Sequence, residues 1–186
     1  NTRIKVSPEE PATIYAKDFD NNGSIDPVMC YYILGVSYPF YAKDDLQAQL
    51  PFIKKKYPDY ESYSDQTTND IFSREELKDA ILLKAAMFTT SYIENKGNDQ
   101  FEIRPLPREA QYFPVYGIES GDYNNDGHID IILAGNFTGT RVKFGEQDAG
   151  KGLMLTGNGK GEFTSLKESE SGIFIRGEVR DIEEVK

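Results

Sequence analysis

Residues 18–26 read DFDNNGSID and residues 122–130 read DYNNDGHID, so the pattern D-x-[DN]-x-[DN]-G-x-x-D occurs twice. Alternating oxygen donors in a tight loop suit a hard cation, since Ca²⁺ takes about six to eight oxygen ligands. Glycine stands at the sixth position of both loops, where the chain must turn sharply. Asn/Asp/Gly turns that bind no ion share this composition, but two loops in one register favour two Ca²⁺ sites. The predicted metal ligands are the odd-position residues: Asp18, Asp20, Asn22, Ser24, Asp26, Asp122, Asn124, Asp126, His128 and Asp130.

The residues after each loop distinguish between kinds of calcium loop. An EF-hand needs a bidentate glutamate at position twelve and a helix on either side, but position twelve is Met29 or Leu133. The segments that follow, PVMCYYIL (27–34) and IILAG (131–135), are rich in the aliphatic, β-branched and aromatic residues typical of strands. We therefore expect each loop to join two strands of a β-hairpin, with Ser24 and His128 offering backbone carbonyls to the ion.

The sequence around the loops also repeats. A strand-like segment precedes each loop, and a pair of strand-like segments joined by a glycine turn follows at 92–107 and at 153–166. The repeated unit is four antiparallel strands, which is the composition of a propeller blade. The predicted parts of the single propeller segment 1–186 are a first blade from 1–38 and 91–107, a second blade from 108–171, and the start of a further blade at 172–186.

The first copy of the unit is longer than the second and contains a helical pattern. From Asp18 to Asn95 is 77 residues and from Asp122 to Asn158 is 36, a difference of 41. We assign this difference to an insertion at 39–90. DDLQAQLPFIKKKY (44–57) and SREELKDAILLKAAMF (73–88) both have apolar residues at helical spacing, and the second opens with a capping box. Helices are expected there, with a polar, tyrosine-rich loop between them.

Composition excludes several functional classes. The formal net charge of −10 disfavours nucleic acid and anionic membranes as partners. No apolar stretch approaches the roughly 18–20 residues that a membrane span needs. A single cysteine and a single histidine exclude disulfide frameworks and cysteine-rich zinc sites. We expect a protein whose partners are calcium and a glycan or protein ligand, with no nucleic acid and no membrane span.

Catalytic residues are not evident. His128 lies within the second loop, Cys30 lies in an apolar strand, and acidic residues such as Glu94 have no recognisable partner. We therefore predict that the chain is not itself an enzyme. Tyrosine can line a sugar- or protein-binding surface because it combines apolar area with a polar hydroxyl, or it can pack in the core. The tyrosines to which both readings apply are Tyr31, Tyr32, Tyr38, Tyr57, Tyr60 and Tyr63.

The calcium loops, together with IDIILAGN (129–136) and the NGKGEF hairpin (158–163), resemble FG-GAP/VCBS-type repeats. These are the propeller blades of integrin α-subunit heads and of many secreted bacterial proteins. Over nearly its whole length, from NTRIKVSPEEP to DYNNDGHIDIILAGNF, the chain resembles the large surface proteins of Bacteroidetes with VCBS repeats, which often carry an ASPIC/UnbV segment. Asn22 and Asn124 stand where the family more commonly has aspartate, which weakens the charge of each loop but keeps an oxygen ligand.

The resemblance implies a mainly β fold that is part of a β-propeller, with about two four-stranded antiparallel blades, the start of a third and a helical insertion. It also implies calcium between the first two strands of each blade. The expected function is a calcium-binding repeat module with a structural or interaction role, such as adhesion or binding of a glycan or protein ligand. The expected location is extracellular or at the bacterial cell surface, secreted or attached to the outer membrane. The alternative is part of a carbohydrate-active or other hydrolase or lyase propeller whose catalytic residues lie outside this fragment.

Overall fold

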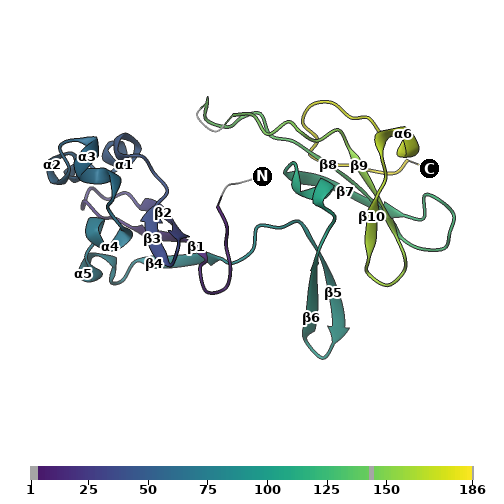
Figure 1. Ribbon diagram of the computed structural model, residues 1–186, viewed down its shortest axis with the longest axis horizontal. Coiled ribbons are helices and arrows are strands. Elements are labelled where there is room, and N and C mark those ends of the chain that lie inside the picture. Colours follow the sequence, from purple (N-terminus) through teal and green to yellow (C-terminus); the bar gives the residue numbers. More distant parts are fainter. Residues whose placement is uncertain (1–3, 143–144, 186) are drawn as a thin grey trace. The chain divides into compact units, whose positions relative to one another are not determined.

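The computed structural model describes residues 4–142 and 145–185 (Figure 1). The chain is mainly β, as predicted, and its sheets are antiparallel. It divides into two compact units, which we call the N-terminal unit (Thr2–Phe88) and the C-terminal unit (Thr89–Lys186). Each unit contains one four-stranded sheet.

The sheet of the N-terminal unit is built on a hairpin of two strands joined by the first predicted calcium loop, which confirms the hairpin prediction there. A two-residue turn at Leu34 and Gly35, both with positive φ (50° and 82°), leads into the third strand. The fourth strand returns to pair with the first, so the strand order is β3-β2-β1-β4, a Greek-key arrangement. The strands are β1 (Ala12–Lys17), β2 (Asp26–Ile33), β3 (Val36–Pro39) and β4 (Ile81–Ala85).

The fourth strand corrects the predicted helix over 73–88. Helix α5 (Arg74–Leu77) does begin with the expected capping box, in which Ser73 and Glu76 bond to each other's backbone. The chain then turns at Asp79, whose φ is +63°, and continues as β4. The apolar residues at 81–83 and 85 fit both the strand period of two and the helical period. The sequence pattern alone therefore does not distinguish a strand from a helix here.

The predicted first blade, from 1–38 and 91–107, is also wrong. Strands β5 (Ser91–Gly97) and β6 (Gln100–Pro105) form a separate two-stranded sheet that belongs to the C-terminal unit. In the first sheet β3 pairs with β2, where the hairpin was predicted, and β4, from inside the predicted insertion 39–90, pairs with β1 at the other edge. The insertion therefore contributes to the sheet as well as covering it.

Short helices fill the rest of the insertion. Pro51 separates α1 from α2. The expected tyrosine-rich loop contains α3 and α4, which start where the side chains of Asp59 and Thr67 accept hydrogen bonds from backbone N–H groups. The helices are α1 (Lys43–Gln49), α2 (Phe52–Lys56), α3 (Tyr60–Ser64), α4 (Thr68–Ile71) and α5 (Arg74–Leu77).

These helices cover one face of the sheet and form a core with it. The rings of Phe19 and Phe52 lie 4.7 and 6.5 Å from that of Phe72 at the centre of this core. The buried members are Val28, Cys30, Leu46, Leu50, Ile53, Tyr57, Tyr63, Ile71 and Phe72. On the other face of the sheet, the side chains of the residues paired between strands are uncharged. They include the exposed residues Ile33, Val36, Ile81 and Leu83.

Cys30 offers a test of this core. It is fully buried, and burial raises the pKa of its thiol to about 11. Because the thiolate is the reactive form, we expect Cys30 to resist a disulfide reagent at pH 8 in the folded protein and to react promptly after unfolding in guanidinium. Absorbance of the released thiolate gives both rates. Prompt reaction under native conditions would contradict the burial of this side chain.

The C-terminal unit contains a sheet in which consecutive strands are neighbours, in the order β10-β9-β8-β7. The second predicted calcium loop joins its first two strands, so the hairpin prediction is confirmed here too. This four-stranded meander lies within the range 108–171 that was predicted to form a blade. Its strands are β7 (Val115–Gly121), β8 (Asp130–Gly135), β9 (Leu153–Gly157) and β10 (Phe163–Ser165), flanked by the 3₁₀ helix η1 (Arg108–Gln111) and by α6 (Glu168–Ser171).

Both faces of this sheet are covered. One face packs Leu133, Leu153 and Leu155 against Leu106 and Phe113. Gly117 on β7 lies on the other face. A Cβ atom added to it would stand 2.8 Å from Cγ1 of Ile182, so the segment 172–182 covers this face.

The segment 172–182 does not have the predicted structure. It was expected to begin a further blade, but residues 172–185 contain no strand. Single backbone bonds attach it instead: Ile175 N–H donates to the carbonyl of Lys151 (2.8 Å) and Val179 N–H donates to that of Gly135 (2.7 Å). With no ladder of bonds to a neighbouring strand, its alternating apolar residues pack onto the sheet as an irregular cover.

Candidate metal centre

The first loop folds around its own side-chain oxygens. The carboxylate at position one accepts hydrogen bonds from the N–H groups at positions five and six, and the oxygen at position three accepts from position five. The oxygen at position five accepts from position seven, and that at position nine accepts from position two. These bonds are Asn22 N–H to Asp18 (3.0 Å), Gly23 N–H to Asp18 (2.8 Å), Asn22 N–H to Asp20 (3.2 Å), Ser24 N–H to Asn22 (2.8 Å) and Phe19 N–H to Asp26 (3.0 Å).

The second loop repeats the same five hydrogen bonds. They are Asp126 N–H to Asp122 (3.0 Å), Gly127 N–H to Asp122 (3.0 Å), Asp126 N–H to Asn124 (2.9 Å), His128 N–H to Asp126 (2.8 Å) and Tyr123 N–H to Asp130 (3.1 Å). The two loops start 104 residues apart (122 − 18) and differ at several positions. One loop structure is therefore used twice.

Two residues in each loop have left-handed backbone. Gly23 and Gly127, at position six, have φ values of 87° and 83°, as the turn argument predicted. Asn21 and Asn125, at position four, have φ values of 59° and 61°. The left-handed backbone at position four was not predicted, although asparagine tolerates this conformation better than most residues. The asparagine that both loops have at position four could have predicted this left-handed backbone.

The first loop brings three carboxylates together. One oxygen each from Asp18, Asp20 and Asp26 lies within 4.8 Å of the other two. Burial raises the pKa of Asp26, and the nearby charges of Asp20 and Asp18 raise it further. Because the pKa is then higher in the folded than in the unfolded chain, ionisation of Asp26 opposes folding as the pH rises through that pKa. A cation bound among the three oxygens would offset this repulsion.

The second loop has an additional hydrogen bond to its sheet, but its three carboxylates are less closely grouped than those of the first loop. Asp130 is fully buried and accepts a second hydrogen bond, from Gly157 N–H on β9 (3.0 Å). At position three the amide of Asn124 donates to Asp126 (2.9 Å), a bond that lowers the pKa of the Asp126 carboxyl. Among residues 4–142 and 145–185, only the first loop forms a group of three such acidic side chains.

The donor chemistry of both loops suits a hard cation. At the odd positions the side chains of aspartate, asparagine and serine offer oxygen, the ligand atom that Ca²⁺ and Mg²⁺ prefer. His128 is the exception, and its ring lies against Gly159, where an added Cβ atom would stand 2.6 Å from Nδ1. Only its backbone carbonyl is thus suited to a ligand role, as predicted for position seven.

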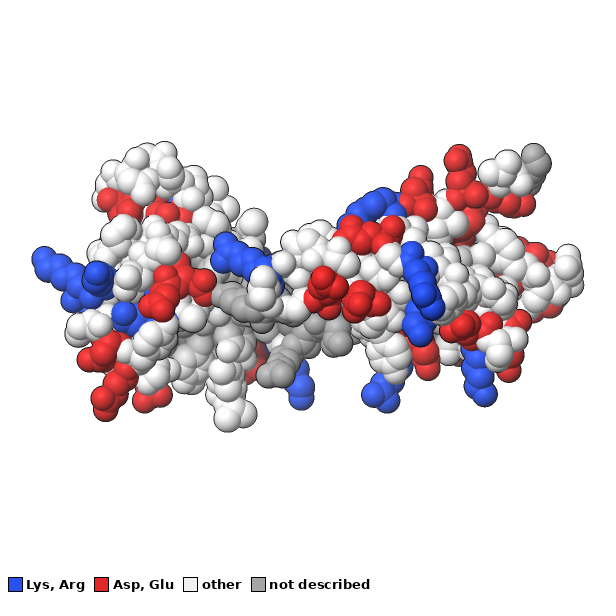
Figure 2. Space-filling view, turned by 90° about the horizontal axis from the view of Figure 1, so that it is seen from above, with Lys and Arg blue, Asp and Glu red and all other residues white. Residues whose placement is uncertain are grey.

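Two acidic residues outside the loops, Glu76 and Glu94, have structural partners. Glu76 accepts the capping hydrogen bond from Ser73 N–H (2.7 Å). Glu94 pairs with Lys96 on its own strand β5 (2.8 Å) and with Arg104 on β6 (3.1 Å). On the face shown in Figure 2, basic side chains are scattered among acidic ones and form no continuous patch. None of these residues suggests a catalytic pair or a surface for nucleic acid.

No protein-family model, curated protein or solved structure matches this chain. In the described part of the chain, no helix has the length and apolar character needed to cross a lipid bilayer. The geometry of the two loops is therefore the main structural basis for a functional assignment.

Proposed function

We propose that this chain is a calcium-binding β-propeller repeat module of a secreted or cell-surface bacterial protein, with a structural and interaction role. The observation that carries the proposal is the identical set of five hydrogen bonds in two nine-residue loops, each with three carboxylates. Such a loop presents its remaining side-chain oxygens to one ion, and the flanking strands hold the loop in place. The residues that would hold the ions are those at the odd positions of each loop.

The propeller part of the proposal is supported chiefly by the C-terminal unit. Its sheet is a meander of four strands with the calcium loop between the first two, the arrangement that an FG-GAP/VCBS repeat would have. The N-terminal sheet departs from this order, but its uncharged outer face, with Ile81 62% and Leu83 57% exposed, suits packing against a neighbouring sheet. That neighbour would come from the rest of the proposed propeller.

Calcium should stabilise both units, and chelation should destabilise them. At a free calcium concentration ten times the dissociation constant, each site adds about 1.4 kcal/mol to the free energy of unfolding. For units of this size, that corresponds to a rise of roughly 5–10 °C in the melting midpoint. Mg²⁺ should have a smaller effect because it dehydrates reluctantly and needs near-octahedral geometry. Calorimetric melting in CaCl₂, MgCl₂ and EGTA measures all three, and equal midpoints in CaCl₂ and EGTA would refute the calcium proposal.

The loops supply their own matched variants for assigning the sites. Asp20→Asn places in the first loop the residue that the second loop has at position three, and Asn22→Asp does the same at position five. Asp20→Asn should weaken calcium binding at the first loop and leave the second unchanged, whereas Asn22→Asp should strengthen the first. Isothermal titration should show two ions per wild-type chain. An unchanged isotherm in both variants would show that the first loop binds no calcium.

A further inference from the structure

The N-terminal unit has an open groove of about 570 Å³ that the calcium loops do not contribute to. It lies where strands β2 and β3 meet the start of α1 and the end of α3. Its volume is within the range of ligand pockets, about 300–1,000 Å³. The residues that matter most here are Tyr31, Tyr38, Tyr41, Lys43, Tyr60 and Gln66.

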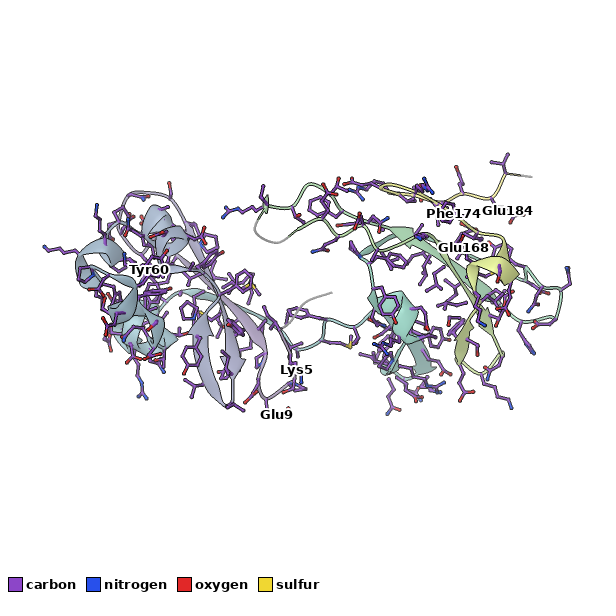
Figure 3. All side chains as sticks on the ribbon, turned by 45° about the horizontal axis from the view of Figure 1, so that its top comes forward. Lys5, Glu9, Tyr60, Glu168, Phe174 and Glu184 are labelled. Atoms are coloured by element: carbon purple, nitrogen blue, oxygen red, sulfur yellow. The ribbon has the colours of Figure 1, made fainter. Side chains whose placement is uncertain are left out.

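The aromatic walls of the groove are fixed in position. The ring of Phe40 packs edge-to-face against those of Tyr31 (6.3 Å) and Tyr41 (6.0 Å). The buried Tyr63 donates its hydroxyl to the carbonyl of Tyr41 (2.9 Å), which ties the groove to the core. Tyr60, labelled in Figure 3, is 55% exposed on α3. Such rings present a face with negative potential, which attracts the partly positive C–H groups of a ligand.

A buried cation lies at the groove and has spare hydrogen-bond donors. Lys43 is only 5% exposed and lines the groove. Its ammonium has three N–H donors, donates to Gln47 Oε1 (3.2 Å) and lies 5.6 Å from the ring centre of Tyr60. Within the described ranges no other oxygen accepts from it. Since a buried donor without an acceptor is costly, the site favours a ligand that brings oxygen atoms.

We infer that this groove binds a neutral saccharide, with sugar rings stacked on the tyrosines and hydroxyl groups bonded to Lys43, Asp65 and Gln66. Neutral sugars are favoured over acidic ones because the carboxylates of Asp44 and Asp65 lie at the site, the first accepting a hydrogen bond from Tyr60 (2.6 Å). A peptide added as a strand is disfavoured because β3 has four residues and ends at Pro39, which has no N–H. The inference is independent of the calcium proposal.

The test uses the full chain in millimolar CaCl₂ and six-residue oligosaccharides of glucose (β-1,4 and α-1,4) and of mannose. Saturation-transfer NMR detects binding, and calorimetric titration measures affinity. We expect at least one of the three to bind, and Tyr60→Ala and Lys43→Met each to weaken it by about tenfold. Tyr112→Ala removes an exposed tyrosine of the C-terminal unit and should leave the affinity unchanged. Tyr60 is exposed, so its replacement should not affect folding, and protection of Cys30 checks the Lys43 variant.

Three outcomes would overturn the inference. They are no binding of any of the three saccharides at millimolar concentration, binding that Tyr60→Ala leaves unchanged, and binding only of an oligogalacturonate or an extended apolar peptide. The Asp20→Asn variant separates this result from the calcium proposal, because it alters the first loop and leaves the groove intact. Saccharide binding that survives in this variant supports the groove whatever happens to calcium.

Discussion

Replacing Asp130 with alanine should lower the free energy of unfolding of the C-terminal unit by about 3–5 kcal/mol and abolish calcium binding at the second loop. The carboxylate is fully buried and accepts hydrogen bonds from Tyr123 N–H in the loop (3.1 Å) and Gly157 N–H on β9 (3.0 Å). Hydrogen bonds to charged groups contribute about 1.5–3 kcal/mol each. Alanine leaves both N–H groups without this acceptor and separates the loop from the sheet.

Chemical denaturation in EGTA isolates the structural part of this effect, because no calcium then contributes. Asp126→Asn is the control: its side chain is exposed in the same loop, and the first loop has asparagine at that position. It should change calcium affinity and leave the stability in EGTA almost unaltered. If Asp130→Ala unfolded at the wild-type denaturant concentration in EGTA, the two hydrogen bonds would not have the importance assigned to them.

Phe72→Ala should destabilise the N-terminal unit by about 3–5 kcal/mol, the usual cost of truncating a buried phenylalanine. Phe72 is 1% exposed, and its ring lies 4.7 Å from that of Phe19. Phe19 is the second residue of the first predicted calcium loop, and its N–H donates to Asp26 (3.0 Å). The cavity would therefore loosen the loop as well as the core, and we expect weaker calcium binding at the first loop only.

The rate at which Cys30 reacts with a disulfide reagent reports the opening of this unit. At a fixed guanidinium concentration, Phe72→Ala should increase that rate by about two orders of magnitude or more, since each 1.4 kcal/mol changes the open population tenfold. Phe72→Leu keeps most of the apolar volume and should fall between the two. A rate equal to that of the wild type would show that Phe72 is not central to the core.

Local features of this fold could be predicted from the sequence. The two loops, their hairpins and their glycines follow from residues within nine positions of one another. The meander of the C-terminal unit follows as well, because its strands pair in chain order. The role of His128 as a backbone-carbonyl ligand stays a prediction from its position in the loop.

Features that depend on distant pairing could not be predicted. The register places Thr13 opposite Lys84, 71 residues away (84 − 13), and no local pattern indicates that partner. The match between 92–107 and 153–166 suggested equivalent places in two blades, whereas β5 and β6 form their own sheet. Of the tyrosines, Tyr57 and Tyr63 lie in the core, whereas Tyr31, Tyr38 and Tyr60 line the groove, where a binding role stays a prediction. By contrast, the convergence of Asp18, Asp20 and Asp26 agrees with their prediction, from the loop spacing, as ligands of one ion.

The Greek-key order of the N-terminal sheet has a consequence for biosynthesis. On the ribosome, β1, β2 and β3 emerge in succession, but the 41 residues from 40 to 80 must follow before β4 appears. At about 5–20 residues per second, the edge of β1 stays without its partner for roughly 2–8 seconds. An unpaired edge invites association between chains, so nascent chains stalled before residue 81 should aggregate or recruit chaperones, and chains stalled well beyond residue 85 should not.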